Sequence, residues 1–214
     1  MKTRFILSAL LFLVANTLFA QTNLLSGWAG NGDTNNTTSY PNNYGWVVNP
    51  GSFNYANSTS GIRWIDITQT SNPLHKLNGN NYAGRLMMLR WDGAGSTSLA
   101  SVYSIPVTLT AGKKYNFSWI YEWWNNANAP ILTVGVSNSR DIADNIFTKD
   151  FQCSSTKNQL TEGSFVFTIN ESKTYYITIK ANNLAALCAL GELNLTEAPP
   201  SLESNVSSVE LNYF

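Results

Sequence analysis

The sequence predicts an all-β protein of the sandwich or barrel class. Short apolar runs alternate with period two, clusters of turn residues separate them, and no segment is convincingly amphipathic at helical spacing. Alternation sends successive side chains to opposite faces of a strand, so each run buries one face. About ten such runs in one chain of 214 residues are typical of all-β sandwiches and barrels.

The first 20 residues predict a secretory signal peptide. Lys2 and Arg4 precede an apolar run over 5–14, and small residues close the segment at Ala20. This order of basic, apolar and small residues favours cleavage after Ala20. A membrane anchor is the alternative, but the apolar run is too short to cross a bilayer and no second such run follows. We therefore predict secretion and no transmembrane segment.

The charge balance argues against a polyanionic partner. Loss of Lys2 and Arg4 leaves 11 of the 13 basic residues against 13 acidic ones, a net formal charge of −2. The densest basic pair that remains is Lys113-Lys114, whereas nucleic acid binding needs clustered cations to neutralise phosphates. A surface rich in Asn, Ser, Thr and aromatic residues instead suits neutral, hydroxylated ligands.

The most informative segment is 103–124, in which two alternating runs flank a tight turn at 111–113. In the second run Tyr115, Phe117 and Trp119 share one parity with Tyr121 and Trp123. The predicted strands are 24–28, 61–68, 84–91, 101–109, 115–124, 131–137, 146–152, 163–169, 173–181 and 189–196. We expect an ordered loop over 34–60, a turn at 170–172, and at most a short helical segment over 181–190.

The pattern indicates one domain over 21–197. A chain of this size is ample for one core and short for two. The segment 198–214 begins near Pro199-Pro200, which cannot continue a central strand. It is predicted to be a linker, a C-terminal tail or the start of a truncated second domain.

The two cysteines, Cys153 and Cys188, are predicted to form a disulfide. An exported protein meets an oxidising compartment, where an even number of cysteines favours pairing. The alternative is two buried free thiols, because Cys188 lies in an apolar segment where it could pack as a small hydrophobic residue.

Four segments resemble the galactose-binding-like jelly-roll modules, which include carbohydrate-binding modules of secreted bacterial glycan-degrading proteins. These segments are Leu24-Leu25 with the glycine-rich turn that follows, 107–119, 174–179 and 190–196. The resemblance implies a two-sheet antiparallel β-sandwich that binds polysaccharide or oligosaccharide on a concave sheet face or on the loops at one end. It also implies that a glycan-degrading enzyme domain is a partner.

The resemblance further implies a structural calcium ion. Related modules hold it with oxygen ligands from the first loop and the last strand, which here offer Asn31, Asp33 and Glu192. An ordinary Asx-rich turn is the alternative for this loop. No other metal is indicated, because the single histidine, His75, has no partners at zinc spacing.

Candidate ligand-binding residues are those that place a flat ring beside hydrogen-bonding groups. A sugar offers an apolar C–H face for stacking and a rim of hydroxyls for polar side chains. The candidates are Tyr121, Glu122, Trp123, Trp124, Asn125, Arg90, Trp91, Asp92, Arg63 and Trp64.

Each of these candidates also has a structural interpretation. Trp64 and Trp91 could belong to the core, and the charged residues could form surface ion pairs. Period two makes one of Trp123 and Trp124 a core residue. Trp124 is the stronger candidate, because it shares the more polar strand face with Glu122.

These observations favour non-catalytic carbohydrate binding over two alternatives. A module that contacts protein is one, since many β-sandwiches do so. A jelly-roll glycoside hydrolase or lyase is the other, but no compact acidic pair stands out, there is no Gly-x-Ser-x-Gly motif, and His75 is expected in a loop.

Overall fold

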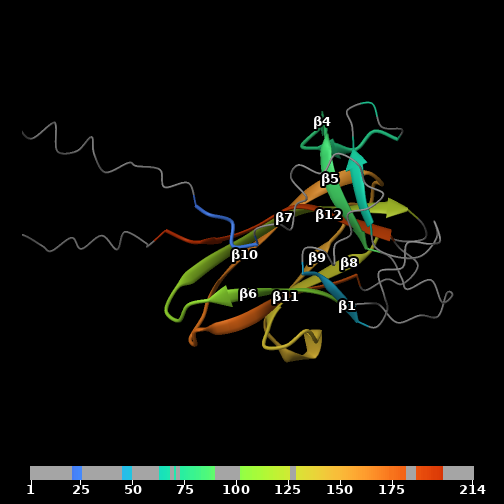
Figure 1. The fold of residues 1–214 in the computed structure, drawn as a ribbon. Helices are drawn as coiled ribbons and strands as arrows, with labels where there is room; N and C mark the ends of the chain where they lie inside the picture. The colour runs from blue at the N-terminus through green and yellow to red at the C-terminus, as the bar shows by residue number, and fades with distance from the viewer. Residues whose placement is uncertain are drawn as a thin grey trace, which may run out of the picture.

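The computed structural model describes residues 21–25, 45–49, 63–67, 70, 73–89, 102–125, 129–181 and 187–199. These residues form two β-sheets packed face to face, with one 3-10 helix, η2 (Ile142–Asp144), among them (Figure 1). The predicted two-sheet antiparallel β-sandwich is confirmed, with one parallel strand pair as the exception. No helix in these ranges has the length and apolar character needed to cross a membrane.

One sheet contains five strands that pair only in antiparallel fashion. In spatial order they are β1 (Val47–Asn49), β6 (Val102–Leu109), β11 (Lys173–Ala181), β8 (Ile131–Ser137) and β9 (Asn145–Gln152).

The other sheet contains seven strands and has one parallel pair, β10 with β3, next to the edge strand β4. In spatial order they are β2 (Arg63–Ile67), β5 (Gly84–Leu89), β12 (Leu187–Glu197), β7 (Lys114–Asn125), β10 (Gln159–Thr168), β3 (Lys76–Leu77) and β4 (Asn80–Asn81).

Two tight turns carry the chain from one sheet to the other. The 111–113 turn joins β6 to β7, and the 170–172 turn joins β10 to β11, although the joined strands lie in opposite sheets. Gly112 has a φ of 75°, which glycine adopts at little cost. The amide of Gly112 donates to the carbonyl of Ile169 at 2.7 Å, so the two crossings lie side by side.

The core lies between the sheets and is rich in aromatic rings. Alternation along β7 is as predicted, because the residues of one parity, from Tyr115 to Trp123, are all buried in it. Trp119 meets Phe151 of the opposite sheet edge to face, with ring centroids 4.6 Å apart, a favourable aromatic arrangement.

The observed strands match most predicted ones, with differences where strands are short or irregular. β8 and β11 have the predicted bounds, whereas β10 begins at Gln159 and not at residue 163. Residues 24–25 form a bend, although the Leu24 amide donates to the Leu195 carbonyl at 2.7 Å. Residues 187–190 belong to β12, so the helix considered for 181–190 is absent from that part.

The β3–β4 hairpin is an element that sequence reasoning missed. Asn78 and Gly79 connect its two strands with φ values of 52° and 81°. Positive φ at both central residues is the signature of a type I′ hairpin turn, for which Asn-Gly is a preferred sequence. The strands have only two residues each, too short to show alternation.

The hairpin packs against a second apolar cluster, on the face of the seven-stranded sheet that points away from the main core. Its buried members are Ile67, Tyr82, Leu86, Ile120, Leu160 and Ala189. Part of this outer face is therefore covered.

Candidate functional site: a groove on the outer face of the seven-stranded sheet

An open groove lies on the outer face of the seven-stranded sheet, where β7, β10 and β12 run side by side. Its volume is about 460 Å³. The residues that line it are Asn116, Ser118, Trp119, Ile120, Glu162, Gly163, Ser164 and Glu192. We call it the outer groove.

Strand register explains why these residues meet. Ser118 and Ile120 have the parity opposite to the buried aromatics of β7, so they face outward. Across the β7–β10 pairing, Ser118 is opposite Ser164 and Ile120 is opposite Glu162. Ile120, which is 3 % exposed and belongs to the second apolar cluster, thus lies between Glu162 of β10 and Gly191 of β12.

A β-bulge in β12 brings Glu192 to the groove. Gly191 pairs with Ile120 and Asn194 with Ser118, so β12 has one extra residue between these two pairings. Glu192 has a φ of 50°, while the next residue, Leu193, is buried in the main core. The bulge therefore keeps the apolar side chain inside and leaves the carboxylate exposed.

The 75–82 segment, which contains the hairpin, contacts one glutamate from each of the three groove strands. His75 bonds Glu122 of β7, and Asn78 Nδ2 donates to Glu162 Oε1 of β10 at 3.1 Å. The Tyr82 hydroxyl hydrogen-bonds Glu192 of β12. Burial, then the charge of Glu192 and this hydrogen bond, raise the pKa of Tyr82.

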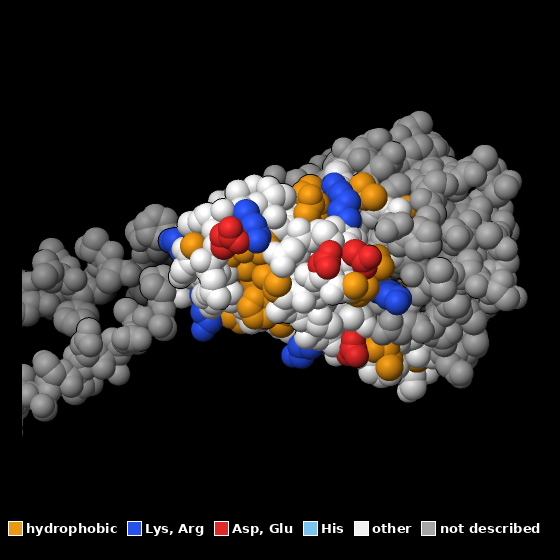
Figure 2. Space-filling model, turned by 90° about the horizontal axis from the view of Figure 1, so that it is seen from below, with side chains coloured by type: hydrophobic (Ala, Val, Ile, Leu, Met, Phe, Trp, Pro, Cys, Tyr) orange, Lys and Arg blue, Asp and Glu red, His pale blue; other side chains and the backbone are white. Residues whose placement is uncertain are grey.

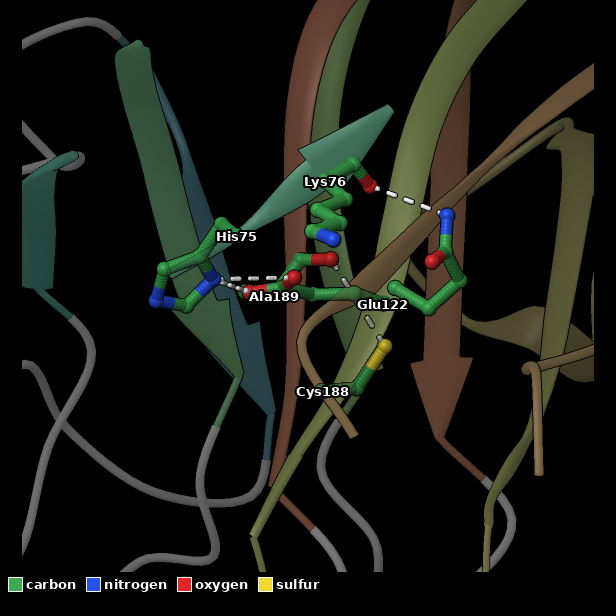
Figure 3. A network of polar contacts seen from close by, with 6 residues as sticks. His75, Lys76, Glu122, Cys188 and Ala189 are labelled. Carbon is green, nitrogen blue, oxygen red and sulfur yellow. Dashed lines mark hydrogen bonds and ion pairs between the residues drawn. The ribbon is translucent and has the colours of Figure 1, made fainter. Parts of the chain in front are cut away.

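The contact between His75 and Glu122 is buried. His75 Nδ1 lies 2.8 Å and 3.0 Å from the two carboxylate oxygens, and the side chains are 2 % and 0 % exposed (Figure 3). Burial raises the pKa of Glu122, and the hydrogen bond from His75 opposes that rise in part. The predicted ligand contact through Glu122 is therefore wrong, because the carboxylate is buried against His75. His75 is likewise buried and not a solvated loop residue.

Tyr121 and Trp123 lie in the main core and not on a ligand-facing surface. Tyr121 is 3 % exposed, and its hydroxyl donates to the Gln152 carbonyl at 3.1 Å. Trp123 is 9 % exposed, with the Lys157 ammonium 5.2 Å from its ring centroid. The prediction that these two rings stack on a sugar is corrected, since strand alternation turns both inward. That one of the two adjacent tryptophans is a core residue agrees with the sequence.

For four further predicted residues the structure describes the backbone but not the side chain. Trp124 and Asn125 belong to β7, and Arg63 and Trp64 belong to β2. The predicted residues outside the described ranges are Arg90, Trp91, Asp92, Asn31 and Asp33. These positions stay predictions.

The calcium prediction rests on one described residue. Glu192 lines the outer groove and bonds the Tyr82 hydroxyl. Among the residues that the structure describes, no three His, Cys, Asp or Glu side chains gather into a metal site. Calcium coordination by Glu192 with the first loop therefore stays a prediction.

Cys153 and Cys188 are neighbours but are not bonded. Their sulfur atoms are 3.9 Å apart, beyond the disulfide bond length of about 2.05 Å. Both are buried free thiols, and the contact with Cys153 together with burial raises the pKa of Cys188. The predicted pair is in contact, and the predicted bond is not formed in this structure.

The basic side chains on the face seen in Figure 2 are dispersed among neutral and apolar ones. Described ion pairs, such as Lys113 with Glu197 and Lys173 with Glu171, are exposed, and exposed pairs contribute little to stability.

Comparison with known proteins shows similarity of fold. No protein-family model matches the sequence, and no curated protein is significantly similar to it. The structure is similar to TmCBM61 solved in complex with β-1,4-galactotriose, with 14 % identity, a TM-score of 0.50, and coverage of 83 % of this chain and 99 % of that one. It is also similar to the arabinose-bound MgGH51 α-L-arabinofuranosidase, at 13 % identity and a TM-score of 0.52.

These matches define the class of fold. The second one covers 82 % of this chain and only 26 % of the arabinofuranosidase chain, so the shared fold is a part of that larger protein. The chain has the jelly-roll β-sandwich architecture of carbohydrate-binding modules, and the resemblance seen in the sequence is confirmed at the level of fold.

Proposed function

We propose that this protein is a secreted, non-catalytic carbohydrate-binding module and that its glycan lies in the outer groove. The observation that carries the proposal is the groove itself, an open, mostly polar depression on a sheet face in a fold similar to a module named for carbohydrate binding.

The chemistry of the groove suits a hydroxylated ligand. Asn116 offers both a donor and an acceptor, and the hydroxyls of Ser118 and Ser164 do the same. Glu162 and Glu192 add strong acceptors. Each hydrogen bond between neutral groups contributes a net free energy of only about 0.5–1.5 kcal/mol, so binding requires several such bonds together.

Aromatic stacking is proposed to add to these polar contacts. Tyr121 and Trp123 are excluded by burial, so the rings must come from other predicted positions. The proposed contacts that carry over from the sequence are Trp124, Asn125, Trp91, Arg90, Asp92, Trp64 and Arg63.

The proposal includes export and modular organisation. Residues 1–20 would be removed as a signal peptide, residues 21–197 would form the binding module, and 198–214 would lead toward a further domain or end as a tail. A glycan-degrading enzyme is the proposed partner. In the oxidising compartment Cys153 and Cys188 would then form a disulfide, which their contact favours.

Affinity electrophoresis on a panel of neutral polysaccharides tests the proposal. Ser164→Leu removes a hydroxyl and places a larger apolar side chain in the groove. Thr174→Leu is the matched control, because Thr174 is exposed on β11 of the other sheet. We expect retention of the wild type and of the control on at least one glycan, and loss of retention for Ser164→Leu.

Two results would overturn this assignment. If no glycan on the panel retards the wild type, the carbohydrate proposal fails and a protein-contacting module takes its place. If the protein releases reducing sugar from a retained glycan, the non-catalytic assignment fails.

A further inference from the structure

We propose that Glu162 and Glu192 are the ligand-recognising acceptors of the outer groove, and that their charges restrict it to uncharged glycans. Asn78 and Tyr82 act as positioning residues that orient the two carboxylates. This inference rests on the proposed function and specifies its substrate class.

The two carboxylates flank the floor of the groove from opposite sides. Glu162 of β10 pairs with Ile120 of β7, and Gly191, the residue before Glu192, pairs with the same Ile120 from the β12 side. Neighbouring strands lie about 4.8 Å apart, so the backbones of β10 and β12 are about 10 Å apart across β7. A chain of sugar residues on the floor would therefore have a carboxylate on either side.

Each carboxylate is held by an uncharged donor. The Asn78 amide binds one oxygen of Glu162 at 3.1 Å, and the Tyr82 hydroxyl binds Glu192. Gly84 makes room for that hydroxyl, because a Cβ at this position would collide with it. A neutral donor fixes the direction of a carboxylate and leaves its charge, and its further lone pairs, for the ligand.

The groove is consequently acidic. Glu162 and Glu192 are exposed, and the ion pairs described above join Lys113 to Glu197 and Lys173 to Glu171, away from these two glutamates. The charged residues that line the groove are these two glutamates. An ionised carboxylate accepts hydrogen bonds from sugar hydroxyls, whereas it repels the carboxylate of a uronic acid at close range.

The experiment compares one polymer in two charge states. The probe is the neutral hexose polymer with free C6 hydroxyls that retards the wild type most strongly on the panel, together with the same polymer oxidised at C6 to uronate. At low salt we expect the oxidised polymer to bind at least about tenfold more weakly, and the difference to shrink as salt screens the charges.

Four variants separate recognition from positioning. Glu162→Gln with Glu192→Gln keeps the side-chain shape, and the double variant should lose most of the discrimination and bind the neutral polymer about tenfold more weakly. Tyr82→Phe and Asn78→Ala should weaken neutral binding several-fold yet keep the discrimination, because both charges remain. Glu171→Gln, in the 170–172 turn, is the control and should change neither value.

The outcomes distinguish this inference from the proposed function. If the wild type binds the neutral and oxidised polymers equally at low salt, the charge restriction is refuted while carbohydrate binding stands. If the double variant keeps full discrimination, Glu162 and Glu192 are not its source. If no polymer is retained at all, the proposed function is refuted and this inference with it.

Discussion

The buried contact between His75 and Glu122 makes a quantitative prediction about stability. His75→Leu leaves a carboxylate that is 0 % exposed without the imidazole nitrogen at 2.8 Å. Leaving a buried group without its hydrogen-bond partner costs about 1–3 kcal/mol of folding free energy, and more when that group is charged. Because domains of this size have about 5–15 kcal/mol in total, the single variant should be severely destabilised.

The double variant is the decisive comparison. His75→Leu with Glu122→Leu replaces the pair by apolar groups, and such replacements of buried pairs are often neutral or stabilising. The neighbouring cluster, with Ile120, Leu160 and Ala189, supplies apolar contacts for the new side chains. We therefore expect the double variant to be more stable than His75→Leu alone by about 2 kcal/mol or more.

Urea unfolding followed by tryptophan fluorescence measures these free energies, and the double-mutant cycle gives the coupling. An additive cycle, in which each single variant costs less than about 1 kcal/mol, would refute the argument that this contact fastens the hairpin to β7. Circular dichroism of the single variant checks that the sandwich still forms.

The pH dependence of the same contact has a defined sign. The pKa of Glu122 in the folded protein is raised above its ordinary value of 4.5. The folded state thus keeps this proton at pH values where the unfolded chain has lost it, and the contribution of Glu122 to stability decreases as pH rises from 4.5 through the folded pKa. His75→Leu removes an interaction that lowers this pKa, so the loss of stability with rising pH should be larger in that variant. Glu122→Gln should lack the part of the pH dependence that comes from Glu122. If the free energy of unfolding changes with pH equally in Glu122→Gln and in the wild type, Glu122 is not the source of that dependence.

Three further changes test the packing. Gly163→Ala places a Cβ 2.6 Å from Trp119 Cε2, and the buried indole cannot easily move away. We expect the free energy of unfolding in urea to fall by about 1–3 kcal/mol. An unchanged unfolding midpoint would contradict this close approach. Air oxidation should convert Cys153 and Cys188 to a disulfide, seen as the loss of two hydrogens by mass spectrometry, and raise stability by about 3–4 kcal/mol; full labelling of both thiols after unfolding of the oxidised protein would refute it. Gly79→Ala should destabilise the hairpin by about 0.5–1 kcal/mol, because Gly79 has a φ of 81°. Hydrogen exchange of the hairpin amides measures this effect, and we expect it to be faster in the variant. Unchanged exchange would count against the positive φ.

The all-β class and most of the strands could be predicted from the sequence alone. Alternation along β7, β8 and β11 depends only on which neighbouring side chains are apolar, so it is visible without any partner strand. The same alternation indicated that Asn116, Ser118 and Ile120 lie on a face distinct from the core. The Asn78-Gly79 pair was an available signal for the missed hairpin.

Tertiary structure alone decided which residues share the groove. Glu162 and Ser164 reach Ser118 and Ile120 through the pairing of β10 with β7, and Glu192 reaches them through the bulge in β12. Strand pairing joins residues that are far apart in the chain, and its order and register do not follow from the period of one strand.

The interpretation of Glu122 shows the same limit. A glutamate on a polar strand face predicts exposure, yet the 75–82 segment covers it and supplies His75 as a partner. Composition and alternation determined the sandwich, its buried aromatic layer and an outer polar face. The burial of one glutamate and the exposure of two others came from long-range contacts, because the free energy of a side chain depends on which distant segment lies against it.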